Sequence, residues 1–427
     1  MDKTKKFIIY LLPVFIWLFY SGIFFTGKID DRSNELNYFK FLSQSILNGR
    51  FDVDCPHGTG CADLVEYNGK YYLYWPWVPA IVYLPIVAAV GTNIPDVLIS
   101  SIFGVINIFL LIIFLRLFSE KFDLKIKESD VILLCLFWGL GTVHFYMSMV
   151  GSVWFIAQIM AQTFLLLSAV FILKYQTVAG FFLSGFFYAL AVYTKNDVLF
   201  FVFFLCAIWY VLCYKKGNKN LQQIMSFFLP FVIISILNLG YNYVRFGNMF
   251  ENGIKYHRMH EYFRPNYVRY GYFSIFYFPH NFITEVLLPP PFKTTFPFFK
   301  YEIEGFGFLW NSPLFLLIIP FVYFIFTKNK KKRIALKKDD VILLTGAFLS
   351  LLFISSVIFL IMGNGWAQFA SRYSLDYQLM LFVFLLYSFA YLRQYKWFFP
   401  VVTLLLLISF YMNVNGVLYF LGPELKI

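Results

Sequence analysis

The stretch VLISSIFGVINIFLLIIFLRL, residues 97–117, decides the fold class of this chain. It is apolar almost throughout, and its length matches the ~20 residues that an α-helix needs to cross a bilayer. A basic and polar segment, residues 118–129, follows it, and a second apolar stretch occupies residues 130–149. This alternation predicts helices that cross a membrane and are joined by loops outside it.

The composition extends this interpretation to the whole chain. Of its 427 residues, 60% are apolar, 23% are aromatic and only 14% are charged, and the mean hydropathy is +0.68. Soluble domains are about half apolar and a quarter charged. A soluble enzyme and a disordered chain are therefore both excluded. The net charge of +12 would suggest a nucleic-acid partner in a soluble protein, but here we expect it to reflect membrane topology.

Eleven apolar segments are predicted to span the membrane. They cover residues 7–25, 97–117, 130–149, 155–173, 178–193, 198–214, 222–243, 311–327, 341–362, 375–392 and 397–420. Met1–Lys6 is rich in lysine, and no small-residue cleavage site follows, so we expect an uncleaved first span with its N-terminus in the cytoplasm. The predicted fold is an all-α polytopic membrane protein, with residues 1–427 forming a single transmembrane domain.

Lysine and arginine concentrate in the loops that this topology places in the cytoplasm, residues 118–129, 174–177, 215–221, 328–340 and 393–396. Two long segments, 26–96 and 244–310, fall on the opposite side and have sparser positive charge. This distribution follows the positive-inside rule. The apolar stretch Pro76–Val90 is short and contains three prolines, so we expect it to lie at the outer surface instead of spanning.

Two of the five cysteines, Cys55 and Cys61, lie in the first outer segment as Cys-Pro-His-Gly-Thr-Gly-Cys. The proline and glycines allow the thiols to approach, and an outer compartment would oxidise them, so a disulfide is favoured over free thiols. A zinc site would need two ligands beyond His57, so no metal is expected there. Cys135, Cys206 and Cys213 fall in apolar spans and are interpreted as packing residues.

The first outer segment carries acids and aromatic residues. Asp30, Asp31 and Glu35 precede a helical pattern that runs from Leu36 to Gly49 and is predicted to lie along the bilayer surface. Such acids are typical of helix capping, but they are also placed to meet a lipid headgroup. Further along, Asp63 precedes an aromatic run in which Asn68-Gly69 predicts a tight turn. That run fits an interfacial belt or a sugar-binding surface.

Charged groups elsewhere in the chain supply candidate cations. The second outer segment interleaves Arg258 and other basic residues with tyrosines, which fits recognition of a phosphate. His257 and His260 have no obvious third ligand, so no metal site is predicted. Lys195 with Asp197, and Arg372 with Asp376, lie near the outer ends of spans, where they either snorkel to the interface or turn inward to a site.

Several stretches resemble the GT-C superfamily of membrane glycosyltransferases. Asn34-Glu35-Leu-Asn-Tyr38 looks like that family's Asp-Glu-x-x-Tyr stretch, with asparagine in place of the leading acid, and Gly69-Lys70-Tyr-Tyr-Leu-Tyr-Trp-Pro-Trp-Val-Pro is similar to its Lys-Pro-Pro region. The further similar stretches are Gly141-Thr-Val-His144-Phe-Tyr, Arg245-Phe-Gly-Asn-Met-Phe-Glu-Asn-Gly and Ser371-Arg-Tyr373.

The resemblance implies an inverting glycosyltransferase in a bacterial inner membrane. Such an enzyme moves a sugar from a polyprenyl-phosphate donor, such as undecaprenyl phosphate, to a cell-envelope glycan, lipid or protein on the outer face, with lipopolysaccharide O-antigen as one class of acceptor. No cofactor, metal or nucleic acid is implied. Because Asn34 departs from the pattern, the catalytic base is expected at Asp31, then Glu35, then Asp63. The implied substrate-binding residues are Lys70, His144, Lys195, Arg258, Arg372 and Tyr373.

Two other functions stay open at this stage. A lipid-linked glycan polymerase would also have large outer loops with arginines. A flippase or transporter would often show internal repeats and mid-membrane charges, and neither is evident in this sequence.

Overall fold

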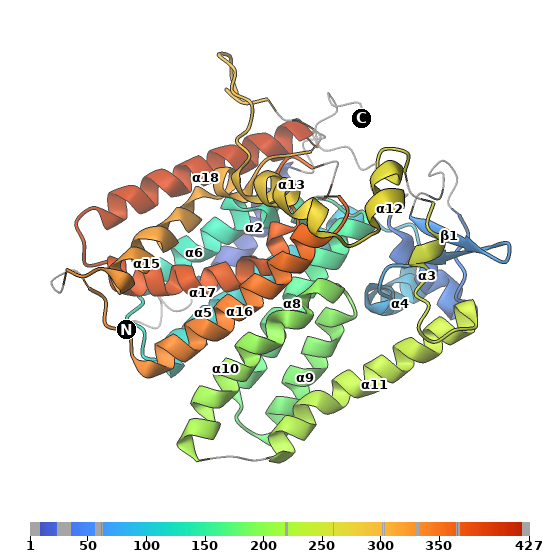
Figure 1. Ribbon diagram of the computed structural model, residues 1–427, viewed down its shortest axis with the longest axis horizontal. Helices are drawn as coiled ribbons and strands as arrows, with labels where there is room; N and C mark the ends of the chain where they lie inside the picture. Colours follow the sequence, from blue (N-terminus) through green and yellow to red (C-terminus); the bar gives the residue numbers. More distant parts are fainter. Residues whose placement is uncertain are drawn as a thin grey trace.

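The computed structural model describes residues 9–23, 36–55, 61, 63–217, 221–258, 260–300, 302, 304–329, 333–363, 365 and 368–420. Within these ranges the chain is mostly helical, with irregular loops and one two-stranded hairpin (Figure 1). The α-helices are α2 (Leu12–Ile23), α3 (Tyr38–Leu47), α4 (Val78–Val90), α5 (Asp96–Lys121), α6 (Glu128–Gly141), α7 (Val143–Ser148), α8 (Val153–Lys174), α9 (Val178–Val192), α10 (Val202–Leu212), α11 (Leu221–Phe246), α12 (Arg264–Tyr270), α13 (Phe278–Phe282), α14 (Phe308–Asn311), α15 (Ile318–Phe326), α16 (Lys338–Leu360), α17 (Ser374–Leu392) and α18 (Phe398–Phe420).

The hairpin consists of β1 (Leu64–Tyr67) and β2 (Lys70–Leu73). The described chain also contains short 3₁₀- and π-helical turns. The 3₁₀ turns are η1 (Ile9–Leu11), η4 (Asn196–Phe201), η5 (Tyr214–Lys216), η6 (Ile254–Tyr256), η7 (Ile275–Tyr277) and η9 (Pro313–Leu317), and η8 (Ile283–Leu287) is a π-helical turn.

Six of the described helices are long and apolar enough to cross a membrane: Asp96–Lys121, Val153–Lys174, Leu221–Phe246, Lys338–Leu360, Arg372–Leu392 and Phe398–Tyr419. Five further apolar helices are shorter, Ile9–Ile23, Val78–Val90, Val178–Val192, Asn196–Leu212 and Pro313–Phe326. These features are those of an all-α protein embedded in a membrane. The segment 130–149, expected as one continuous helix, is divided because Thr142 is extended and caps α7 by accepting a hydrogen bond from the His144 amide.

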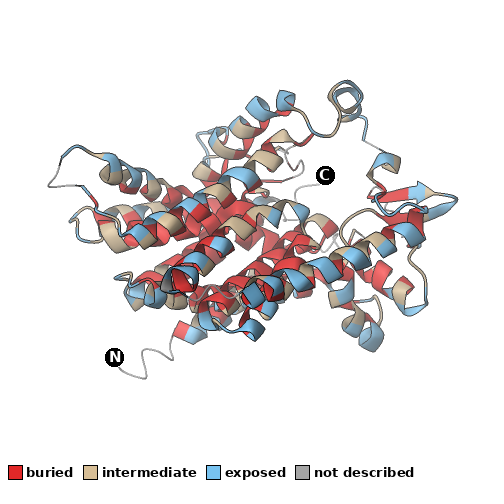
Figure 2. Cartoon of the chain, turned by 60° about the horizontal axis from the view of Figure 1, so that its bottom comes forward, coloured by how far each residue is buried: buried red, intermediate tan, exposed pale blue. Residues whose placement is uncertain are grey.

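Helices α8 and α17 are buried along most of their length. Figure 2 shows that buried residues gather in the central helices of the molecule, while exposed residues lie towards its edges. Helix α8 packs against α5 and α9, and α10 packs against α16. By contrast, α11 leaves most of its apolar residues exposed, including Ile236 and Val244. A helix that is apolar all round yet little covered by protein is suited to a lipid environment.

Local signals in the first outer segment are confirmed. Helix α3 begins at the N-cap Asn37, whose side chain accepts from the Phe39 amide (3.2 Å). The turn at Asn68-Gly69 has both residues at positive φ and joins β1 to β2 in antiparallel register. Cys55 and Cys61 form a disulfide with a Cα–Cα distance of 5.6 Å. Of the other cysteines, Cys135 and Cys213 are buried, whereas Cys206 is exposed on α10 and not packed in the interior.

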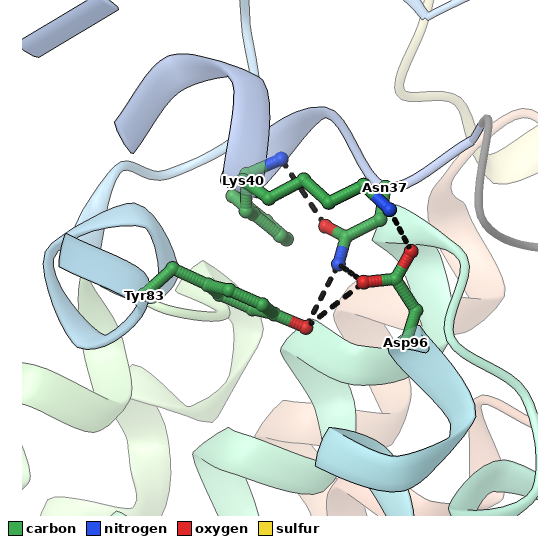
Figure 3. A network of polar contacts seen from close by, with 5 residues as sticks. Asn37, Lys40, Tyr83 and Asp96 are labelled. Atoms are coloured by element: carbon green, nitrogen blue, oxygen red, sulfur yellow. Dashed lines mark hydrogen bonds and ion pairs between the residues drawn. The ribbon is translucent and has the colours of Figure 1, made fainter. Parts of the chain in front are cut away.

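A buried polar network joins α3, α4 and the start of α5 (Figure 3). Lys40 Nζ contacts Asp96 Oδ2 at 2.7 Å, and the Asn37 amide donates to Asp96 Oδ1 (2.6 Å) and to the Tyr83 hydroxyl (2.8 Å). All four side chains are almost fully buried. Breaking a buried ion pair by removing one partner costs ~3–5 kcal/mol, because the other charge is left without compensation. This network therefore fixes the position of the first outer segment against the helices.

Candidate functional site

A cluster of charged side chains forms where several segments, distant in the sequence, meet at the N-terminal ends of α8 and α17. We define this polar cluster as Asp63, Lys195, Asp197, Arg372 and Asp376. Asp63 precedes β1, Lys195 and Asp197 lie in the turn after α9, and the other two residues flank the start of α17. All five side chains are largely buried.

Asp63 is held by two donors on one carboxylate oxygen. The Trp154 indole donates to Asp63 Oδ1 at 3.2 Å, and the Tyr74 hydroxyl lies 3.4 Å from the same oxygen. The second oxygen, Oδ2, is buried and has no hydrogen-bond partner among the described residues. Burial raises the pKa of Asp63 above its ordinary value, while the Trp154 hydrogen bond and the nearby Arg372 and His257 side chains oppose the rise. The result is a carboxylate with one free oxygen and enhanced basicity.

Arg372 lies near the Asp63 carboxylate and is surrounded by aromatic rings. Its guanidinium carbon is 5.0 Å from the ring centres of Phe155 and Tyr373 and 5.9 Å from that of Trp154. The residue is 6% exposed, it enters no ion pair with any described residue, and its Nε has no hydrogen-bond partner there. Buried charges in proteins are normally paired. An arginine in this state is prepared to bind an anion.

The remaining members of the polar cluster are one cation, Lys195, and two acids that both pair with it, Asp197 and Asp376. Lys195 Nζ contacts Asp197 Oδ2 at 2.9 Å and Asp376 Oδ2 at 3.5 Å. The amide of Gln158 donates to both carboxylate oxygens of Asp376 at 3.0 Å. Lys195 also lies 4.9 Å from the centre of the Tyr373 ring, so this ring contacts both cations of the cluster. Lys195 therefore forms ion pairs within the structure, whereas Arg372 forms none with a described residue.

Glu285 is a buried acid next to the cluster that sequence reasoning missed. It lies in η8 and accepts a hydrogen bond from the Ser371 hydroxyl. Burial raises the pKa of Glu285 to about 8, against the effects of the Ser371 hydrogen bond and the Arg372 charge. A single acid within the apolar run Ile283–Leu288 was the available signal in the sequence.

The structure brings together four of the predicted site residues, Asp63, Lys195, Arg372 and Tyr373. Asp31 and Glu35 lie outside the described residues, so their predicted roles remain predictions. The base candidate that can be described is Asp63, the third in the expected order. Trp154 and Gln158 were not predicted, because an aromatic or amide side chain in the first turns of a helix has no distinctive sequence signal. Tyr74 belongs to the aromatic run after Asp63, but its contact with that acid was not predicted.

Three other predicted residues lie apart from these contacts. His144 is fully buried, contacts the Trp138 ring in a tilted arrangement with ring centres 4.4 Å apart, and has its Nε2 3.4 Å from the Asn107 amide. Its environment is that of a helix-packing residue. Arg258 is exposed and pairs with Glu66 at 2.6 Å.

Lys70 is also exposed, with its Nζ 3.5 Å from Asp52. Both cations therefore lie at the accessible surface of the hairpin. His257, next to Arg258, does contact the site region, because its ring lies 4.8 Å from that of Tyr74.

Within the ranges that the structure describes, no three His, Cys, Asp or Glu side chains are grouped so that they could hold a metal ion. What the polar cluster offers is a carboxylate able to accept a proton and an arginine able to bind an oxyanion. No protein-family model matches the chain, and a search of curated proteins finds no match.

Proposed function

We propose that the chain is an inverting glycosyltransferase of the GT-C type, which uses a polyprenyl-phosphate sugar as donor. The observation that carries the proposal is the juxtaposition of Asp63, whose Oδ2 has no described hydrogen-bond partner, and Arg372, which forms no ion pair with a described residue. Sugar transfer needs these two groups, since an acceptor hydroxyl must lose a proton and a phosphate must leave with added negative charge. The sequence resemblance to the GT-C superfamily supports the same reaction.

In the proposed reaction, a carboxylate takes the proton from the acceptor hydroxyl as the oxygen attacks the anomeric carbon of the sugar. The bond from that carbon to the phosphate oxygen breaks, its electron pair stays with the phosphate, and the sugar configuration inverts. Asp63 is the described acid best suited to be the base, with Asp31 and Glu35 as the alternatives. Arg372 would stabilise the departing phosphate through its planar donors, and Lys195 would hold Tyr373 and Asp376 in position.

The proposal includes eleven spans, a cytoplasmic N-terminus and a site on the outer face of a bacterial inner membrane. Helix α17 supports this arrangement, because the polar cluster lies at its N-terminal end and the basic residue Arg393 follows its C-terminal end. Its 19 residues span about 28 Å, close to the thickness of the hydrocarbon core. Reporter fusions after Asn266 and after Asn329 should therefore give opposite compartments, and identical signals would contradict the topology.

Transfer itself can be tested with purified protein in lipid nanodiscs, radiolabelled polyprenyl-phosphate sugars and glycan acceptors. Arg372→Gln should lower turnover by ~10²–10³-fold, as loss of a group that stabilises developing negative charge does. Arg50→Gln is the matched control, because it removes an equal charge from a surface pair with Asp54. Equal activity of the two variants would contradict the proposed role of Arg372.

The same protein reconstituted in liposomes separates transfer from transport. Movement of the labelled lipid across the bilayer without formation of a glycosidic bond would replace the glycosyltransferase with a flippase. Repeated addition of lipid-linked glycan units would indicate a polymerase.

A further inference from the structure

A pocket with polar groups in its wall lies next to the polar cluster, on the side of α11. Its volume is about 400 Å³, within the ~300–1,000 Å³ typical of ligand pockets. The wall is formed by the chain leaving β2, the end of α9, the C-terminal half of α11 and the loop at residues 249–252. Tyr74 and Asn196 belong to this wall, and they also connect it to the cluster, since Tyr74 contacts Asp63 and Asn196 follows Lys195. We call it the Arg245 pocket.

Arg245 supplies the charge of this pocket. It is 5% exposed, its guanidinium lies 3.8 Å from the centre of the Tyr241 ring, and its two terminal nitrogens donate to the Leu73 carbonyl and to Asn242 Oδ1, each at 2.7 Å. These bonds fix the orientation of the side chain, while Nε keeps no described partner.

The positive charge of Arg245 is not neutralised within the pocket. No acidic residue is among the described residues of its wall. The nearby acid Glu251 is already paired with Lys255 and accepts a hydrogen bond from the Gly253 amide. A buried and rigid cation that has no acid beside it in the pocket wall is the electrostatic complement of an anionic ligand group.

The rest of the wall combines aromatic rings with side-chain amides. Trp75 and Trp77 line it, and Trp77 is anchored by a 3.0 Å hydrogen bond from its indole to Asn238 Oδ1. Asn196 and Asn252 are exposed amides at the same wall. Aromatic faces suit the apolar faces of a sugar ring, and amides can both donate to and accept from its hydroxyls.

We propose that the Arg245 pocket binds an acidic sugar, a ring that carries a carboxylate or a phosphate, with the anionic group on Arg245. The inference rests on the proposed function in one respect. If the polar cluster transfers a sugar, the inference states that the glycan bound next to the cluster is acidic. Binding to the pocket does not depend on any transfer of a sugar.

The test is a binding measurement with purified protein in nanodiscs of neutral lipid, without donor lipid. The probes are a glucuronate-terminated disaccharide, glucose 1-phosphate and the neutral disaccharide maltose. Their binding is measured by saturation-transfer NMR and by tryptophan fluorescence. We expect the acidic probes to bind at least about tenfold more tightly than maltose, and the stronger of the two identifies the anionic group. Maltose binding as tightly as the acidic probes, or no binding of any probe, would overturn the inference.

Because Arg245 is buried, its replacement can disturb folding, so the decisive variant is Asn252→Asp. Asn252 is exposed, and its Oδ1 accepts from the Ile254 amide, a hydrogen bond that aspartate retains. The new negative charge should weaken the acidic probe by about five- to tenfold and leave maltose unaffected. Asn248→Asp is the matched control, since Asn248 caps the Phe250 amide in the same way but does not line the pocket.

Equal affinity for the acidic probe in Asn252→Asp and in the wild type would overturn the inference. The two proposals fail separately. If the acidic probe binds tightly and Asn252→Asp weakens that binding, but no sugar is transferred, only the proposed glycosyltransferase activity is contradicted. If sugar is transferred but the acidic probe does not bind in this way, only the proposed acidic-sugar pocket is contradicted.

Discussion

The Trp154 indole donates a hydrogen bond of 3.2 Å to Asp63 Oδ1, which ties the start of α8 to a loop residue 91 positions earlier in the chain. Since this bond occupies one carboxylate oxygen, the other oxygen, Oδ2, is the one left without a described hydrogen-bond partner. It also tunes the acid, because a donor to a carboxylate stabilises the charged form.

Trp154→Phe should therefore move the acidic limb of the pH–rate profile for sugar transfer to higher pH. Burial already raises the pKa of Asp63, and the Trp154 hydrogen bond lowers it. Removing that bond raises the pKa further, so a higher pH is needed to ionise the base. Trp209→Phe, on α10, is the control and should leave the limb in place. An unshifted limb in Trp154→Phe would show that Asp63 is not the group being titrated.

The network around Asp96 should dominate the stability of the first outer segment. Lys40→Met leaves the buried Asp96 charge without its cation, and we expect a loss of ~3–5 kcal/mol in the free energy of unfolding. Lys337→Met removes a lysine from an exposed pair with Asp123 and should cost less than ~1 kcal/mol. Denaturation of detergent-solubilised protein measures both, and similar values for the two variants would contradict the role of the network.

Stability should also depend on pH through Glu285. Its pKa is raised to about 8 in the folded state from an ordinary value of 4.5, so above about pH 4.5 the unfolded state binds fewer protons than the folded one. The free energy of unfolding therefore falls as pH rises from about 5 to about 8, by at most ~1.4 kcal/mol per pH unit. Glu285→Gln should remove this slope, while the exposed Glu302→Gln should keep it. A slope that persists in Glu285→Gln would assign the titration to another group.

Thiol counting tests the disulfide and the compartment together. In denaturant, a thiol-reactive polymer should modify Cys135, Cys206 and Cys213 before reduction, and Cys55 and Cys61 in addition after it. The disulfide requires an oxidising compartment for the first outer segment. Modification of all five cysteines in protein taken directly from the native membrane without reductant would place that segment in a reducing compartment.

Features that depend on neighbouring residues could be predicted from the sequence. The Asn68-Gly69 turn, the helix after Asn37 and the Cys55–Cys61 pair each follow from a few adjacent residues. The helical pattern of α3 did not, however, indicate that Lys40 is buried. Its burial results from the packing of α3 against α4 and from the Asp96 carboxylate 56 positions away.

The candidate site depends still more on long-range packing. The sequence marked Asp63, Lys195 and Arg372 as charges near the ends of spans, but it could not show that they converge. Asp63 and Arg372 are brought near each other by α8, whose residues Trp154 and Phe155 contact them. Glu285 escaped prediction because its neighbours are apolar and its hydroxyl partner, Ser371, is 86 positions away.

The assignment of the base is tested by Asp63→Asn. Asparagine keeps the size of the side chain, and its carbonyl oxygen can still accept from Trp154 and Tyr74, so the fold and the donor affinity should be retained. It cannot take a proton from a hydroxyl, and loss of a general base typically slows turnover by ~10²–10⁴-fold. Turnover and binding of the polyprenyl-phosphate sugar should be measured on the same preparation.

Asp31→Asn and Glu35→Gln belong in the same series, because the sequence favoured those two acids ahead of Asp63. Normal turnover in Asp63→Asn together with a loss in one of the others would move the base and keep the mechanism. If Asp63→Asn instead loses binding of the polyprenyl-phosphate sugar, the Asp63 carboxylate serves to hold Arg372 in position and is not the base. Near-normal turnover in all three variants would contradict base catalysis by the first outer segment, and with it the glycosyltransferase that we propose.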